Sequence, residues 1–185
     1  MGSRLFALGA AVALLALAGC TENRGEDAGT LPPLQIVQQP AASAGGACIL
    51  WDYAFIEEKI GVKFSVAAAD QVDDASTCVV QTERDEWPYL ALCVVESTKA
   101  DAALFTEELT PKKATKLKGL GKAGYRLVTK ATDGHGPTVE IGWLSEAAQL
   151  QTLRFTFAED AAGADVTKMS PKLLALAKAM DTTEG

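Results

Sequence analysis

The chain has 185 residues, in which 24 acidic side chains outnumber 17 basic ones, and its net charge is −7. An acidic surface repels the phosphate backbone of nucleic acids, so we expect no nucleic-acid partner. The sequence holds one histidine and four cysteines without a C-x-x-C pair. This composition disfavours a metal site and a histidine-based catalytic triad, and we expect no cofactor.

The N-terminus has the pattern of an exported lipoprotein. Arg4 precedes an apolar run over residues 5–18, whose 14 residues are too few to span a bilayer as a helix. Such a run behind a basic residue is typical of a signal peptide, here residues 1–19. Leu17-Ala18-Gly19-Cys20 resembles the bacterial lipobox, in which the cysteine thiol is acylated. We therefore predict lipidation of Cys20 and a position at the outer face of the cell membrane, the alternative being an ordinary signal peptide with an incidental cysteine.

Composition then divides the mature chain into a tether and one domain. Residues 20–47 are rich in Gly, Pro, Ala, Ser, Gln and acids, and they show no helical or strand period. This pattern predicts a disordered tether behind the lipidated Cys20. Residues 48–185 are enough for a single domain with one hydrophobic core.

The first half of the domain predicts a helix followed by three strands. Asp52 is a candidate N-cap, apolar residues follow at helical spacing, and Gly61 is a candidate helix stop. Extended, β-branched runs then predict strands at 63–69, 77–83 and 89–97. The last two strands flank a turn, so they read as a hairpin.

The second half repeats this element order. Residues 100–109 predict a helix, and Thr110-Pro111 predict a further helix to Lys118. Three more strands are predicted at 124–129, 138–144 and 151–157. A last helix is predicted over 171–180, with Ser170 as its N-cap. The expected fold class is α+β, with antiparallel sheet packed against helices in the order α-βββ-α-βββ-α.

A family resemblance emerges from these features. Cys48-Ile49-Leu50 opens a helix that ends at Gly61, Cys78 begins a strand, and Gly119-Leu120-Gly121-Lys122-Ala123 leads into a later strand. With the lipobox and polar tether in front, the chain resembles the actinobacterial lipoproteins grouped as domain of unknown function 3558. The element order also resembles the fold shared by Mog1 and the photosystem subunit PsbP. Neither resemblance implies a catalytic site.

The three cysteines of the domain leave two pairings open. The resemblance implies a Cys48–Cys78 disulfide, which leaves Cys93 as a buried thiol. A hairpin centred between Asp85 and Glu86 instead places Cys78 opposite Cys93 on one sheet face. Outside the membrane a disulfide is the expected state of either pair.

Two features suggest contacts with other molecules. Lys112, Lys113 and Lys116 would share one face of the helix predicted over 111–118, where they could contact anionic headgroups or phosphate-bearing wall polymer. The other interpretation is a solvated helix face. Trp87 sits in a turn, where an aromatic side chain serves as a partner contact or folds back over the sheet.

Two other motifs carry less information. Gly119 to Gly124 matches G-x-G-x-x-G, but a dinucleotide site needs a strand before the loop and a helix after it. The order predicted here is the reverse, so we interpret the segment as a glycine turn. His135 lies between two glycines and is interpreted as a solvated loop residue.

The functional hypothesis is a non-catalytic envelope lipoprotein that binds a partner protein, a wall polymer or a small apolar ligand. One alternative is an envelope hydrolase that uses serine or carboxylate chemistry, and another is a purely structural or immunogenic surface component. A deep apolar pocket would favour a small ligand, and two acids or a Ser–Lys pair in one cleft would favour the enzyme. A filled core beside an exposed patch would favour a protein partner.

Overall fold

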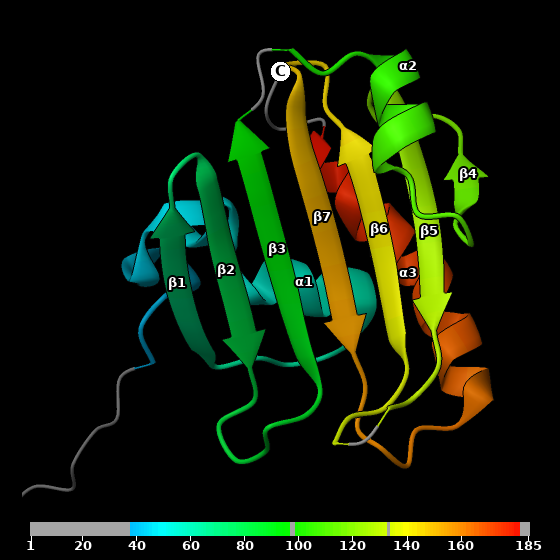
Figure 1. Cartoon of the computed structure of the whole chain (residues 1–185). Coiled ribbons are helices and arrows are strands. Elements are labelled where there is room, and N and C mark those ends of the chain that lie inside the picture. Colours follow the sequence, from blue (N-terminus) through cyan, green and yellow to red (C-terminus); the bar gives the residue numbers. More distant parts are fainter. Residues whose placement is uncertain (1–37, 97–98, 133, 182–185) are drawn as a thin grey trace, which may run out of the picture. The chain divides into compact units, whose positions relative to one another are not determined.

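One antiparallel sheet organises the domain. The computed structural model describes residues 38–96, 99–132 and 134–181. Within these residues seven strands form a single sheet in the order β1-β2-β3-β7-β6-β5-β4 (Figure 1). The domain is α+β, as predicted.

Two meanders build the sheet and meet at its centre. The first runs through β1 (Val66–Val72), β2 (Ala75–Gln81) and β3 (Tyr89–Glu96). The second runs through β4 (Thr115–Leu117), β5 (Ala123–Thr129), β6 (Thr138–Leu144) and β7 (Gln149–Thr156). The pairing of β3 with β7 joins the two halves, with Leu92 opposite Leu153.

The first helix, α1 (Tyr53–Ile60), forms where the sequence predicts it. The Asp52 carboxylate accepts hydrogen bonds from the backbone N–H groups of Ala54, at 2.7 Å, and Phe55, at 3.4 Å. Gly61 ends the helix in the left-handed conformation, with φ of 76°. Ile56 and Ile60 are fully buried, so this short helix is held by packing as well as by its caps.

The last helix, α3 (Gly163–Asp181), lies with α1 behind the sheet (Figure 1). Its Lys172 ammonium donates to the Ile60 carbonyl at 3.0 Å, which satisfies an orphan oxygen at the end of α1. The core between these helices and the sheet consists of side chains that alternate along the strands. Its central members are Cys78, Val80, Leu90, Leu92, Val139, Ile141, Trp143, Leu153 and Phe155.

The sequence prediction placed the start of α3 too late. Ser170 does not cap the helix, because its hydroxyl donates to the Val166 carbonyl one turn earlier. Pro171 lies inside the helix instead of at its first turn. Val166 and Met169 are buried in the preceding turns, so burial extends the helix toward Gly163 despite the proline.

The helix predicted over 111–118 is wrong. The Thr110 hydroxyl donates to the Phe105 carbonyl at 3.0 Å. Pro111 then begins a turn, in which the Ala114 N–H donates to the Pro111 carbonyl at 2.8 Å. Thr115–Leu117 then pairs with β5 as an edge strand. Pairing with an otherwise open sheet edge overrides the local helical signal. Before this turn, α2 (Ala102–Leu104) and the π-helical turn η3 (Phe105–Leu109) occupy the helix expected over 100–109.

The folded domain begins before Cys48, inside the stretch expected to be tether. The short 3-10 helices η1 (Ala41–Ala44) and η2 (Gly46–Leu50) precede α1. Ala41 is fully buried, and the Ala47 N–H donates to the Ser76 hydroxyl of β2 at 2.8 Å. The alanines that read as linker composition therefore pack as small core residues, which composition alone does not reveal. Residues 20–37 of the expected tether lie outside the described residues.

Candidate functional site: the open face of the sheet

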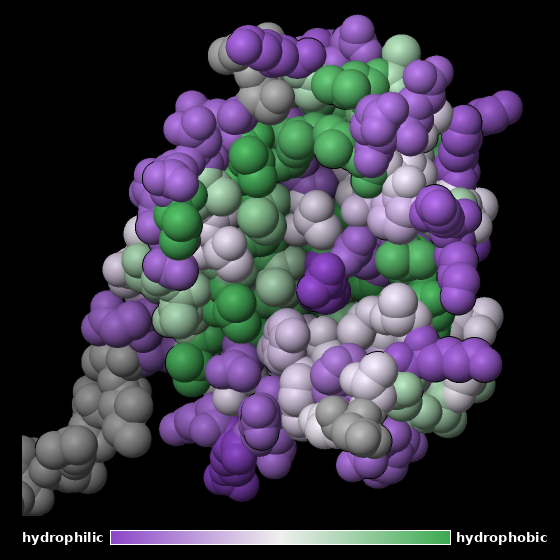
Figure 2. Space-filling model, in the orientation of Figure 1, coloured by the Kyte–Doolittle hydropathy of each residue, from purple (hydrophilic) through white to green (hydrophobic). Residues whose placement is uncertain are grey.

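The sheet has two unlike faces. One carries the core under α1 and α3, and we call the other the open face. The central floor of the open face consists of half-buried side chains from β2, β3 and β7: Thr77, Val79, Ala91, Cys93, Val95, Leu150 and Thr152. Figure 2 looks onto this face: hydrophobic and pale residues spread over it, most hydrophilic residues gather at its rim, and a strongly hydrophilic spot stands near its middle. No helix in the described part of the chain covers this floor (Figure 1).

A buried carboxylate lies at the edge of the floor. Glu140 of β6 is only 6% exposed. Its Oε2 accepts from Arg154 Nε at 2.8 Å and from Arg154 Nη2 at 2.5 Å, across the β6–β7 pair. Its Oε1 accepts from the Tyr125 hydroxyl at 2.8 Å. Both oxygens are thus hydrogen-bonded, which offsets the cost of taking the carboxylate out of water.

Tyr125 reaches this network by lying across a glycine. A Cβ at Gly142 would stand 2.4 Å from the Tyr125 ring, so only glycine leaves room for the ring over β6. Phe105 of η3 stacks on the other side of the ring, with 5.9 Å between centroids. Burial first, and the neighbouring Glu140 charge second, raise the pKa of Tyr125 far above its ordinary value, so the phenol stays protonated.

An aromatic cluster closes one end of the open face. Trp87, in the loop before β3, lies 5.1 Å from the Tyr89 ring and 5.6 Å from the His135 ring. Trp87 therefore folds back over the sheet, one of the two arrangements expected for it, and stays half-exposed. The His135 ring bonds to Thr132 Oγ1 at 2.9 Å and to the Gly136 carbonyl at 2.7 Å. His135 is thus a half-buried loop residue that also packs against Trp87.

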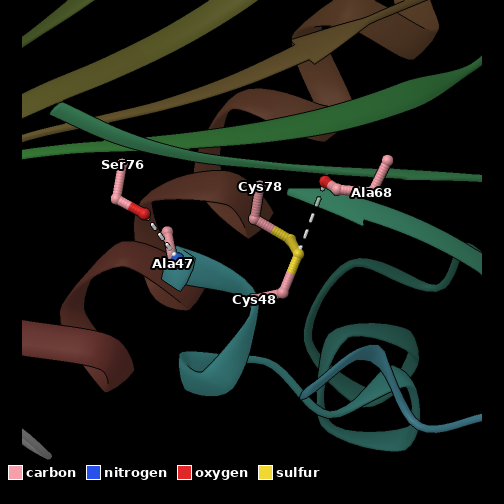
Figure 3. The surroundings of a disulfide bond; sticks show 5 residues. All are labelled: Ala47, Cys48, Ala68, Ser76 and Cys78. Carbon is pink, nitrogen blue, oxygen red and sulfur yellow. Dashed lines mark hydrogen bonds between the residues drawn. A yellow bond between two sulfur atoms is a disulfide. The ribbon is translucent and has the colours of Figure 1, made fainter. Parts of the chain in front are cut away.

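The disulfide joins Cys48 of η2 to Cys78 of β2 (Figure 3). Cys48 Sγ also lies 3.5 Å from the Ala68 carbonyl of the edge strand β1. The bond therefore holds η2 across β1 and β2, on the face that carries the core. It stabilises the fold and leaves the open face untouched.

The alternative Cys78–Cys93 pairing is wrong because the hairpin register differs by one residue from the expected one. Leu92 stands opposite Cys78, and Thr77 stands opposite Cys93. A shift of one residue moves every side chain of a strand to the other face. Cys93 is accordingly a free, half-exposed thiol on the open face, instead of a buried one.

The lysines do not share a helix. Lys112 and Lys113 lie in the turn before β4, and Lys116 lies within β4, opposite Tyr125. All three are exposed. Because residues opposite each other point to the same side of a sheet, Lys116 belongs to the open face, and a contact with anionic groups stays a prediction for these lysines.

The glycine-rich segment is a turn between two strands. It joins β4 to β5, and Gly121 adopts a φ of 50°. A Cβ there would lie 2.1 Å from the Leu144 carbonyl oxygen, and the Gly121 N–H donates to Asp181 at the end of α3. Gly121 is therefore required by its positive φ in the turn and by the close approach of the Leu144 backbone.

The open face also brings together functional candidates that sequence reasoning missed. Glu140 and Arg154 are the single charged residues of their strands, each between apolar neighbours: Val139-Glu140-Ile141 and Leu153-Arg154-Phe155. One acid and one base at interior strand positions are a usable signal for a cross-strand ion pair. Tyr125 gave no such signal, because its role depends on the space above Gly142.

Three open hollows lie beside the N-terminal segment of the described residues. The largest of them, about 480 Å³, is lined mainly by apolar residues that include Ile49, Leu50 and Val94. Ile49 is 67% exposed at its rim. Among the described residues, no three His, Cys, Asp or Glu side chains are placed to hold a metal ion. No helix in that part of the chain is long and apolar enough to cross a membrane.

Comparison with known proteins adds no assignment. No family model matches the chain, and neither a curated protein nor a solved structure matches it. The predicted lipid site, Cys20, lies outside the described residues.

Proposed function

We propose that the chain is a lipid-anchored lipoprotein of the cell envelope whose domain binds a partner protein through the open face. The observation that carries this proposal is the uncovered floor of half-buried, mostly apolar side chains between the aromatic cluster and η3. Contiguous exposed apolar surface on a folded domain is typical of an interaction site. The opposite face is already filled by α1 and α3.

A protein partner fits the floor better than a small apolar ligand does. Small ligands are usually enclosed in deep concave pockets, whereas this floor is a broad sheet surface. At the middle of the open face the exposed charge is the Arg154 guanidinium, whose side chain is 51% exposed, whereas the side chain of Glu140 beside it is 8% exposed. Complementary charge therefore favours a partner segment that combines apolar residues with acidic ones.

The anchor is a separate part of the proposal. Cys20 behind Leu17-Ala18-Gly19 supports acylation and a place at the outer face of the membrane, and the resemblance to the lipoproteins of domain of unknown function 3558 supports the same reading. Labelled palmitate should enter the native protein and not Cys20→Ala. Equal labelling of both proteins would end the claim.

Partner binding is tested by a matched pair of valine variants. Val79 lies on the floor, and Val128 is 48% exposed on β5, in register with core residue Val139 and thus on the opposite side of the sheet. The intact lipoprotein is captured from its own envelope, and captured proteins are quantified by mass spectrometry. We expect Val79→Lys to lose a protein that Val128→Lys retains. Equal recovery of every protein by both variants would contradict binding at the open face.

A further inference from the structure

The Arg154 guanidinium is bonded to the protein along one edge only. Its Nε and Nη2 both bond to Oε2 of Glu140, so the side edge of the guanidinium faces the protein. Arginine carries five N–H donors, and these two contacts use two of them. Within the described residues, no other acceptor is in place for the end edge, formed by Nη1 and the second N–H of Nη2. The side chain is 51% exposed.

The support beneath the guanidinium is rigid. Glu140 is held from the other side by Tyr125, whose ring is confined between Gly142 and Phe105. A charged group whose partners are already fixed loses little conformational freedom when it binds a ligand. The end edge of a guanidinium matches the two oxygens of a carboxylate, with two parallel hydrogen bonds.

The surroundings of Arg154 complete the site. Ala91 stands opposite it on β3, so no large side chain from that strand covers the guanidinium. Next to this pair lie Val79, Cys93 and Thr152, which form an apolar or weakly polar surface. The other charged side chains that the register places on this face are Glu140, Lys116 on β4 and Asp70 at the far edge strand.

We propose that Arg154 is the receptor for a carboxylate of the bound partner, with an adjacent apolar side chain of that partner resting on the floor of the open face. This inference rests on the proposed partner binding and names the group that the site recognises. Glu140 and Tyr125 are positioning residues, because they act through Arg154.

Two small probes that differ only in charge test the inference: N-acetyl-leucine, which has a carboxylate, and N-acetyl-leucinamide, which lacks it. Each is titrated into the ¹⁵N-labelled lipoprotein in an uncharged detergent, and NMR follows the Arg154 Nε–H and the Cys93 amide. The carboxylate should shift both signals saturably and bind at least about tenfold more tightly than the amide. Equal affinities would overturn the inference.

Three variants locate the effect. Arg154→Gln should remove the preference for the carboxylate, and Arg154→Lys, which keeps the charge beside Glu140 but lacks the fork, should bind the carboxylate at least several-fold more weakly. Lys116→Gln should bind it as the native protein does. Native-like affinity in Arg154→Lys, or a loss in Lys116→Gln alone, would contradict a guanidinium receptor.

The outcome is separable from the test of partner binding. If Val79→Lys loses the partner but both probes bind equally, the open face binds through its apolar floor and the carboxylate receptor is wrong. If the carboxylate is preferred but Val79→Lys captures all that Val128→Lys does, the receptor stands and the protein partner is wrong.

Discussion

The two faces of the sheet differ in what their side chains accomplish. On the covered face, Trp143, Leu153 and their neighbours are fully buried by α1 and α3 and contribute the hydrophobic stabilisation of the domain. The open face has the same alternation of side chains, yet at its centre it buries a carboxylate, a phenol and one side of a guanidinium. A polar network of this kind stabilises a fold less than apolar packing does. We therefore expect the covered face to carry most of the stability of the domain, and the proposed partner contact to use the open face.

The largest expected effect is a difference in stability between variants of the two faces. Trp143→Ala removes a fully buried indole from the covered face and should lower the free energy of unfolding by about 3–5 kcal/mol. Val79→Ala removes two methyl groups from a half-buried position and should cost no more than about 1 kcal/mol. Urea denaturation measures both, and similar losses would remove the distinction between the faces.

Removal of the disulfide, which lies on the covered face, should lower stability, whereas a change at Cys93 on the open face should not. Its sequence separation of 30 residues corresponds to about 3–4 kcal/mol in the loop-entropy model, so the Cys48→Ser, Cys78→Ser double variant should lose stability of that order. Cys93→Ser changes a half-exposed thiol and should leave the midpoint nearly unchanged. A large loss in Cys93→Ser would show that the open face also carries fold stability.

Gly142 offers a way to disturb the open face from within. Gly142→Ala places a methyl group 2.4 Å from the Tyr125 ring, which must leave its place between Gly142 and Phe105. Overpacking of this kind costs about 1–3 kcal/mol. In NMR spectra the Arg154 Nε–H should shift, because the Tyr125 bond to Glu140 is lost. An unchanged signal would mean that the ring does not position the ion pair.

The smallest effect is a pH dependence. Burial raises the pKa of Tyr125 above that of the unfolded chain, so the native state keeps a proton that the unfolded state releases above pH 10. Its contribution is fully present below pH 10, and the free energy of unfolding should fall as pH rises above that value. Tyr125→Phe should reduce this fall and remove the last phenol to ionise in an absorbance titration. An identical alkaline titration of the variant would contradict the raised pKa.

Local signals predicted the parts of the fold that depend on local chemistry. Asp52 and Gly61 cap α1 through their own side chain and backbone, so each can be predicted without knowing its neighbours in space. The strands rich in β-branched residues were also predicted from their own sequence. Elements decided by distant partners were mispredicted. Thr115–Leu117 is a strand because β5 pairs with it, and α3 extends past Pro171 because Val166 and Met169 find a core.

The site was less predictable than the fold for a related reason. The open face depends on register, and one residue of error moved Cys93 to the wrong side of the sheet. The shared face predicted for Lys112, Lys113 and Lys116 is absent because the helix predicted there does not form. Glu140 and Arg154 could have been paired from their isolated charges, but the place of Tyr125 over Gly142 arises only when β5, β6 and β7 are assembled.

Cys93 allows the central claim, that a partner covers the open face in the envelope, to be measured directly. With Cys48 and Cys78 in a disulfide and Cys20 acylated, it is the one thiol of the four that remains reactive under this account. The rate of its modification by a maleimide is compared between native membranes and the purified lipoprotein in detergent. We predict slower modification in membranes and a return to the purified rate in Val79→Lys. Equal rates for the native protein in both settings would contradict the account.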